Sequence, residues 1–293
     1  MSGFTVAVDL GNPGQLFACC GLLEAADRLW RDDAFVTGHF EGDHFHVSAP
    51  HELDALLGWL LRGEVKSVEK QVTPVRGSNA GRMELAYDGS GDDPAVLEWP
   101  DGSTWRLNSW SGEDYGRTRL KTFAGQMKGP KVVAHLLEWM RRLEIGNGSP
   151  LFDLARPSAD ASVFGFDARK GRAALDFGFS PDAIGLHTEE FPAVELFAAI
   201  GLQNFRPAQR YRNQATGREP DLLFGLWSRP LPVELARAAA GCAFWPPGER
   251  QRCRFRLLGR KERSGVAGAP NDQYKAFTRA IMETLNTHGD ENE

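Results

Sequence analysis

The chain lacks long apolar runs and has few cysteines. Nowhere in its 293 residues does an apolar run reach the roughly 18 to 20 residues that a membrane-spanning helix needs. The first residues, MSGFTVAVDL, have no basic segment followed by an apolar one, so they do not match a secretory signal. Cys19 and Cys20 are adjacent, whereas Cys242 and Cys253 stand far from them without metal-site spacing. We therefore expect a cytoplasmic protein with buried thiols, no membrane partner, and no cofactor or metal.

An excess of positive charge is also missing. The 34 Lys and Arg residues are outnumbered by 39 Asp and Glu residues, which gives a formal net charge of −5. A protein held on nucleic acid by its net charge is therefore disfavoured, and any such contact has to come from local patches. Several enzyme motifs are absent as well: there is no Walker loop, nucleophile elbow, dinucleotide fingerprint or HEXXH sequence. We therefore predict that the protein is not an enzyme.

The hydrophobic content, 42% of all residues with 18 Phe and 8 Trp, is typical of a packed globular protein. In the first part of the chain, apolar residues alternate at Phe4, Val6 and Val8, as in a half-buried strand. A helix start follows, because Asn12 is a favoured N-cap, Pro13 suits the first helical position and Gln15 stands three after the cap. The predicted elements are strand 4–10, helix 13–30, strands 35–40 and 44–48, helix 50–62 and strand 65–72.

This order of strand, helix, strand, strand, helix, strand is that of a ferredoxin-like (RRM-like or RAMP-like) module, which we assign to residues 1–73. Residues 74–150 are expected to form an insertion or connector, with strands within 83–109 and a helix near 131–143. Residues 151–293 are expected to form a second ferredoxin-like module with a C-terminal helix. The predicted fold class is therefore α+β, with two antiparallel-sheet modules joined by an insertion. Many unrelated proteins share this architecture, so it does not indicate a function.

The elements expected in the second module are strand 172–180, helices starting at Pro192 and Pro232, strands near Gln209 and at 222–227, and strand 252–260. A short repeat supports a duplication: residues 16–22, LFACCGL, recur as LFAAIGL at an offset of 180. A chance match between two apolar helices is the alternative.

Three arginines, Arg252, Arg254 and Arg256, alternate with the apolar residues Cys253 and Phe255. In a strand they would share one face at intervals of roughly 6 to 7 Å, close to the phosphate repeat of a single nucleic-acid strand. The alternative is an edge strand protected from aggregation by its charges. Two further basic stretches are weaker candidates for a nucleic-acid contact: one contains Arg206, Arg210, Arg212 and Arg218, and the other contains Arg117, Arg119, Lys121 and Lys128.

A second polar cluster lies in the predicted hairpin around Gly42-Asp43. A two-residue turn there would place His39 opposite His46, with Glu41 and His44 on the same face. Such a group could bind zinc or supply acid and base groups, but no accompanying metal motif is present. An exposed polar sheet face is the alternative, so we assign no catalytic or metal-binding residue.

The segment from Asn12 to Trp30, NPGQLFACCGLLEAADRLW, resembles the N-terminal signature of small subunits encoded in type I-U (also called I-G) CRISPR loci. The resemblance continues in LKTFAGQ at 120–126 and in FPAVELFAAIGLQNFRP at 191–207. It implies a subunit of a Cascade-type surveillance complex, with guide RNA, target DNA and neighbouring subunits as partners in antiviral defence. The alternatives are a guide-RNA processing endoribonuclease of the ferredoxin-like class and a structural bridge that contacts only protein.

Overall fold

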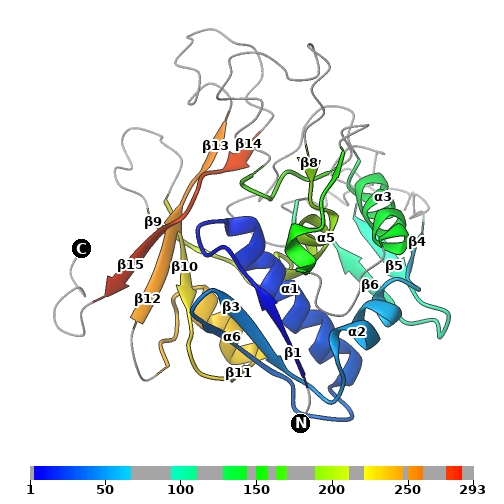
Figure 1. The fold of residues 1–293 in the computed structure, drawn as a ribbon, viewed down its shortest axis with the longest axis horizontal. Helices are drawn as coiled ribbons and strands as arrows, with labels where there is room; N and C mark the ends of the chain where they lie inside the picture. The colour runs from blue at the N-terminus through cyan, green and yellow to red at the C-terminus, as the bar shows by residue number, and fades with distance from the viewer. Residues whose placement is uncertain are drawn as a thin grey trace, which may run out of the picture.

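The computed structural model describes residues 3–66, 94–110, 128–143, 150–157, 163–169, 189–210, 221–246, 250–259 and 275–285 (Figure 1). The helices are α1 (Pro13–Trp30), α2 (Leu53–Leu60), α3 (Gly129–Arg142), α5 (Pro192–Gly201) and α6 (Val233–Ala240), with a short 3₁₀ helix, η1 (Leu151–Asp153). The first strands are β1 (Gly3–Ala7), β2 (Thr37–Glu41), β3 (His44–Ser48), β4 (Glu64–Lys66), β5 (Ala95–Glu98), β6 (Thr104–Leu107), β7 (Arg156–Pro157) and β8 (Glu189–Glu190). The later strands are β9 (Ala208–Arg210), β10 (Asp221–Leu226), β11 (Leu231–Pro232), β12 (Arg250–Phe255), β13 (Leu257–Gly259), β14 (Lys275–Phe277) and β15 (Ile281–Leu285).

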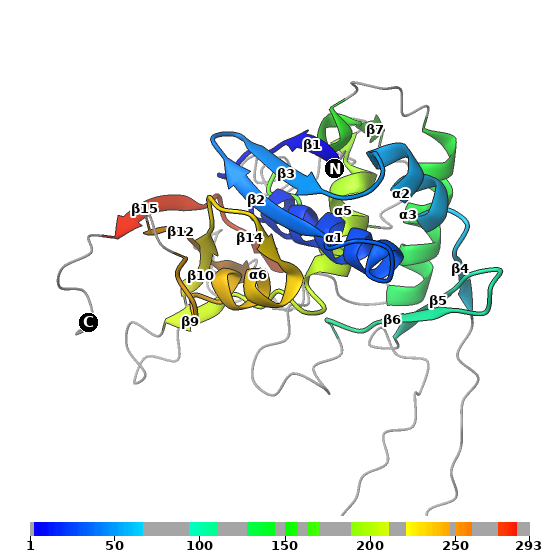
Figure 2. The same ribbon diagram turned by 90° about the horizontal axis from the view of Figure 1, so that it is seen from below.

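Helix α1 runs through the centre of the molecule (Figures 1 and 2). Every residue from Pro13 to Ala26 is buried, as expected for a helix whose apolar residues surround it on all sides. The Phe17 ring meets the Phe224 ring edge-on at 5.5 Å and the Phe255 ring at 6.0 Å. Buried side chains from the beginning, middle and end of the chain form one continuous hydrophobic cluster around this helix. No helix in the described ranges is long and apolar enough to cross a membrane.

One antiparallel sheet has the strand order β1-β3-β2-β11, and we call it the histidine sheet. All six elements predicted for residues 1–73 are present, although 67–72 lie outside the described residues. In a ferredoxin-like module the last strand would return to the edge beside β1. Instead, β4 pairs with β5 of the expected insertion, and Trp59 stacks on Trp99 at 4.6 Å beside it. The closing strand of the expected module therefore belongs to the three-stranded sheet β4-β5-β6.

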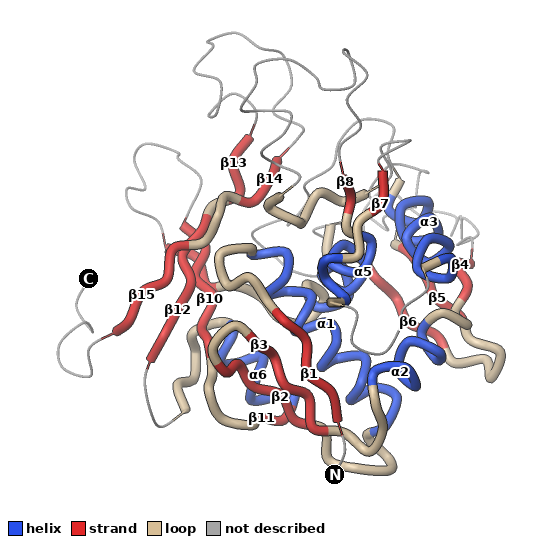
Figure 3. The backbone as a smooth tube through the Cα atoms, in the orientation of Figure 1, coloured by secondary structure: helices blue, strands red, loops and turns tan. Residues whose placement is uncertain are grey.

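A second antiparallel sheet has the order β15-β12-β10-β9, and we call it the arginine sheet (Figure 3). The predicted helices at Pro192 and Pro232 and the strands near Gln209, at 222–227 and at 252–260 are confirmed, while 172–180 lies outside the described residues. Strand β12 pairs directly with β10, which leaves no place between them for another strand. The structure therefore confirms the mixed α+β class but not the two ferredoxin-like modules.

The C-terminal helix expected in the second module is not present in the described residues. The last elements of the described residues are strands β14 and β15. Strand β15 pairs with β12 along its whole length. Glu283 of β15 forms ion pairs with Arg252 and Arg254. These cross-strand contacts explain why this segment is extended. By contrast, the helix expected near 131–143 is confirmed as α3, and β5 and β6 lie within the predicted 83–109 region.

The two copies of the repeated sequence pack against each other. Helices α1 and α5 cross so closely that a Cβ atom on Gly21 would lie 1.9 Å from the carbonyl oxygen of Phe197. Reciprocally, a Cβ atom on Gly201 would lie 2.1 Å from the carbonyl oxygen of Phe17. Gly21 therefore faces Phe197, and Gly201 faces Phe17. These two contacts are equivalent, because 21 and 201, like 17 and 197, differ by the repeat offset of 180. A reciprocal contact of this kind is what a twofold axis produces between two like units.

The Asn12-Pro13-Gly14-Gln15 segment begins α1 and also ties it to a distant loop. Asn12 accepts a hydrogen bond from the backbone N–H of Gly14 (3.1 Å) and donates one to the Asp167 carboxylate (2.9 Å). Gln15 reaches past the cap and accepts from the backbone N–H of Asp9 at 2.6 Å. A Cβ atom on Gly14 would lie 2.4 Å from the carbonyl oxygen of Phe166, so only glycine fits there. The segment is therefore a buried junction as well as a helix start.

Candidate nucleic-acid interface

Strand β12 places its arginines as the alternating sequence predicts. Cys253 and Phe255 are buried against the core, with exposed fractions of 0% and 2%. The side chains of Arg252, Arg254 and Arg256 lie on the opposite face and are 20%, 24% and 38% exposed. The shared face predicted for the three arginines is therefore confirmed.

The pairing of neighbouring strands adds further charged residues to this face. Strand β9 places Arg210 directly opposite Asp221 of β10, and β15 places Glu283 directly opposite Arg252 of β12. Directly opposed residues in antiparallel strands point to the same face of a sheet. Arg250, two residues before Arg252 on β12, lies on this face by the same alternation. The structure thus gathers five arginines and two carboxylates, which we call the arginine face: Arg210, Arg250, Arg252, Arg254, Arg256, Asp221 and Glu283.

The two carboxylates hold the β12 arginines in place. Glu283 accepts from the Nε atoms of Arg252 at 2.7 Å and Arg254 at 2.5 Å. Asp221, only 2% exposed, accepts from Nε of Arg256 and lies 3.8 Å from a guanidinium nitrogen of Arg254. The carboxylates therefore fix the arginine side chains in a row along the strand.

These contacts also shift the ionisation of the partners. Burial raises the pKa of the Glu283 carboxyl, but hydrogen bonds from Arg254 and Arg252 outweigh it, so that the pKa lies below its usual value. The hydrogen bond to Glu283 raises the pKa of Arg254. Glu283 and Arg254 are therefore both charged at neutral pH. Five arginines and two carboxylates give a formal excess of three positive charges on the arginine face.

Helix α6 packs over part of this face. A Cβ atom on Gly225, which lies opposite Arg252, would be 2.2 Å from the carbonyl oxygen of Ala239 in α6. The exposure of the arginines rises with distance from this contact, from Arg252 to Arg256. Arg250, before Arg252 on β12, is exposed as well, so both ends of the row are more accessible than Arg252.

Among the other predicted contact residues, Lys128 lies within the described ranges and does not reach this face. Lys128 is exposed and directly precedes α3, which lies at the opposite end of the molecule from the arginine sheet (Figures 1 and 2). Five predicted residues lie outside the described residues: Arg117, Arg119, Lys121, Arg212 and Arg218. For these, a role in nucleic-acid contact stays a prediction.

The histidine sheet carries the second polar cluster. His39 of β2 lies opposite His46 of β3, and Glu41 lies opposite His44, as predicted for the Gly42-Asp43 turn. The rings of His39 and His46 stack at 4.9 Å, and Nε2 of His46 lies 3.4 Å from Glu41. Burial lowers the pKa of His39, and the neighbouring His46 lowers it further, although Glu41 acts in the opposite direction. His39 is therefore neutral at neutral pH.

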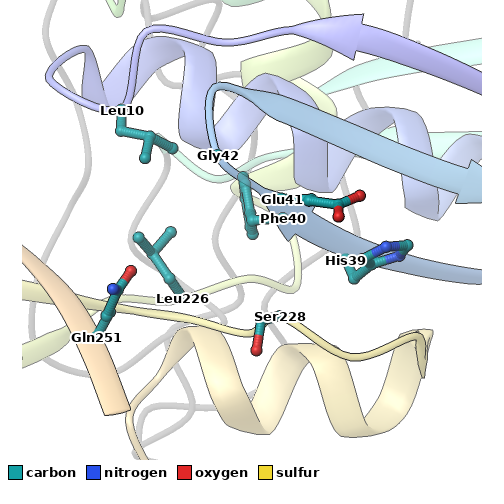
Figure 4. A pocket seen from close by; sticks show the side chains of 8 residues that line it. All are labelled: Leu10, His39, Phe40, Glu41, Gly42, Leu226, Ser228 and Gln251. Atoms are coloured by element: carbon teal, nitrogen blue, oxygen red, sulfur yellow. The ribbon is translucent and has the colours of Figure 1, made fainter. Parts of the chain in front are cut away.

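A pocket of about 470 Å³ lies beside this cluster (Figure 4). His39 and Glu41 line it from β2, and Leu226 and Gln251 line it from the arginine sheet. Gln251 alternates with the arginines along β12, so it points to the face opposite theirs. The pocket and the arginine face therefore open on different sides of the arginine sheet.

Sequence reasoning did not find Asp221 and Glu283 as partners of the arginines. Both carboxylates are distant from β12 in sequence, and only strand pairing brings them together. Because a C-terminal helix is expected from the sequence for the second module, the sequence does not place Glu283 in a strand that pairs with β12. Leu226 and Gln251, which form one wall of the pocket, belong to β10 and β12. Sequence patterns could not predict that these strands lie beside the histidine sheet.

No family model matches the chain, and neither a curated protein nor a solved structure gives a significant match. The resemblance of Asn12 to Trp30 to CRISPR subunits therefore stays a prediction.

Proposed function

We propose that the protein is a non-catalytic subunit of a type I-U (I-G) Cascade-type CRISPR surveillance complex, which contacts guide RNA and/or target DNA and neighbouring subunits in antiviral defence. The observation that carries the nucleic-acid part is the gathering of five arginines on one face, from β9, from β12 and from the residue that follows β12. The identity of the complex rests on the resemblance of the N-terminal segment. The net charge of −5 agrees with a contact made by a local patch.

The ion pairs are compatible with phosphate binding. A guanidinium group has five N–H donors, so an arginine bonded to one carboxylate keeps donors for a phosphate oxygen. Because Asp221 and Glu283 already fix the side chains, less rotamer freedom is lost when a phosphate binds. The three excess charges provide the attraction, and the row along β12 follows the spacing of a single-stranded backbone.

We also propose that the chain contains two related halves, each built on a sheet module of ferredoxin-like ancestry. The reciprocal contact of Gly21 and Gly201 supports this proposal. Gln15 and Glu195 add to it, since they differ by the same offset of 180. Gln15 accepts a hydrogen bond from the backbone of the segment before α1, and Glu195 accepts from the backbone N–H groups of residues 165–167.

The proposed role is tested by purifying the tagged full-length chain from its own cells and identifying what accompanies it. We expect RNA with a repeated sequence together with protein partners. The variant Arg254→Gln/Arg256→Gln should keep the protein partners and lose most of the RNA. Arg142→Gln on α3, whose side chain is 71% exposed, is the matched control and should retain both.

Removing two partners of the buried Asp221 could destabilise the chain, so thermal melting accompanies each purification. If the double variant does not fold, Arg256→Gln alone tests the most exposed of Arg252, Arg254 and Arg256. Protein partners without nucleic acid would favour a structural bridge and overturn the proposed contact. Equal RNA recovery with folded Arg256→Gln, Arg142→Gln and unmodified chains would also overturn it.

A second candidate function, guide-RNA processing, is favoured by the three histidines of the β2–β3 hairpin, of which His39 lines the pocket. A neutral His39 could act as a general base, with His46 as its partner. Incubation of the purified chain with a repeat RNA in the presence of a chelator tests this function. Cleavage that disappears when His39, His44 and His46 are all replaced by alanine would establish it in place of the non-catalytic role, and absence of cleavage would exclude it.

A further inference from the structure

The hairpin of β2 and β3 brings three possible metal ligands to one face of the histidine sheet. His39 and Glu41 are two residues apart on β2, and His46 faces His39 across the hairpin. A ligand atom of each lies within 4.8 Å of the others. The inner face of the same strands is apolar, with Phe40 and Phe45 buried, so the backbone that carries the three residues is anchored in the core.

The distances are close to those of a coordination sphere. Zinc binds imidazole nitrogen and carboxylate oxygen at about 2.0–2.2 Å, which places neighbouring ligands of a tetrahedron about 3.3–3.5 Å apart. Nε2 of His46 and Oε2 of Glu41 are 3.4 Å apart. The remaining separations, at most 4.8 Å, need to shorten by no more than about 1.5 Å, which side-chain rotation can supply.

His46 is held in an orientation suited to a metal ligand. Its Nδ1 atom lies 2.9 Å from the hydroxyl oxygen of Thr5, which is its cross-strand neighbour on β1. A hydroxyl accepts as well as donates, so it can accept a hydrogen bond from Nδ1–H, and in that tautomer the lone pair on Nε2 is free for a metal. Metal-binding histidines commonly use their second nitrogen in this way.

The surroundings leave room for a further ligand. His39 and Glu41 also line the 470 Å³ pocket, so an ion bound by them would lie at its rim (Figure 4). Sites with two histidines and one carboxylate leave at least one coordination position open to water or another oxygen ligand. The pocket offers space for that ligand beside Leu226 and Gln251.

We propose that His39, Glu41 and His46 form a binding site for a divalent transition-metal ion of the zinc class. Two imidazoles and one carboxylate favour Zn²⁺, Co²⁺ or Ni²⁺ over the harder Mg²⁺, which prefers oxygen ligands alone. The site lies on a different side of the arginine sheet from the arginine face, and the proposal does not depend on nucleic-acid binding or on the proposed complex.

The test uses the full-length chain, purified without a histidine tag and treated with a chelator. Zn²⁺ binding is measured by calorimetry and by competition with a chromophoric chelator, and Co²⁺ is used to report coordination through its visible spectrum. We expect one Zn²⁺ per chain, no comparable binding of Mg²⁺, and loss of affinity by at least about tenfold in His39→Ala, Glu41→Gln and His46→Ala.

His44→Ala is the matched control, because His44 shares the hairpin and pairs with Asp43 at 2.7 Å instead of joining the cluster. It should bind Zn²⁺ as the unmodified chain does. Glu41 is 75% exposed, so Glu41→Gln tests the site without disturbing the fold. A folded, unmodified chain that binds no Zn²⁺ would refute the proposal, as would Zn²⁺ binding that survives Glu41→Gln and both histidine substitutions.

Discussion

Replacing Gly21 with alanine should destabilise the protein, although alanine is the better helix former. The new Cβ atom would lie 1.9 Å from the carbonyl oxygen of Phe197, whereas carbon–oxygen contacts settle at about 3.3–3.6 Å. Helices α1 and α5 would therefore have to separate by about 1.4 Å or more at their crossing. Such overpacking costs about 1–3 kcal/mol or more, against about 1 kcal/mol gained in helix propensity. We expect a net loss of about 2 kcal/mol in the free energy of unfolding.

Gly58 provides the matched control for this prediction. It lies within α2, and a Cβ atom placed on it would meet nothing within 4 Å. Gly58→Ala should therefore stabilise the protein by about 0.5–1 kcal/mol, since only the unfolded-state entropy and helix propensity change.

The assay is guanidinium unfolding followed by circular dichroism, in which a pure stability change moves the midpoint without changing the slope. In the double variant Gly21→Ala/Gly201→Ala, the second substitution should cost less than it does alone, because the helices have already moved apart. A Gly21→Ala protein as stable as Gly58→Ala would refute the close crossing of α1 and α5.

Three further predictions concern buried or charged side chains. Because the pKa of Glu283 is lowered in the folded state, its ionised carboxylate stabilises the fold above about pH 4.5, and this stabilisation disappears on acidification. The difference in the free energy of unfolding between the unmodified chain and Glu283→Gln should therefore narrow as pH falls from 7 towards 3. Arg237→Met leaves Glu24, only 5% exposed, without its bidentate partner, and should lower the free energy of unfolding in urea by about 3 kcal/mol. The double variant Glu24→Leu/Arg237→Met should lose less, because it leaves no unpaired buried charge. At pH 8 a thiol reagent should label Cys242 slowly, because burial raises its pKa to about 11. It should not label Cys253, whose pKa burial raises to about 12. Rapid labelling of both cysteines in the native state would contradict the packing around β12.

Local elements could be predicted from the sequence because their signals lie within a few residues. Alternating Phe4, Val6 and Val8 indicated β1, the Asn12-Pro13 pair indicated the start of α1, and Gly42-Asp43 indicated the hairpin. The facing positions of His39 and His46 followed from the turn length alone.

The pairing of distant strands could not be predicted in the same way. Residues 64–66 form the strand that the apolar pattern indicated, but nothing in the pattern shows that it pairs with β5 and not with β1. The ion pairs of Arg254 with Glu283 and Asp221 depend on the order β15-β12-β10, which is a tertiary property. The sequence identified the arginines, whereas their neutralising partners emerged only from the structure.

The proposed nucleic-acid contact is tested most directly by the salt dependence of single-stranded RNA binding to the purified full-length chain. Each phosphate contact makes the slope of log K against log salt concentration more negative by about 0.7 for a single strand. We predict that Arg254→Gln/Arg256→Gln makes the slope less negative by about 1.4 relative to the unmodified chain, whereas Arg142→Gln leaves it unchanged. Equal slopes for all three proteins, or no binding by the unmodified chain, would contradict a phosphate contact at the arginine face.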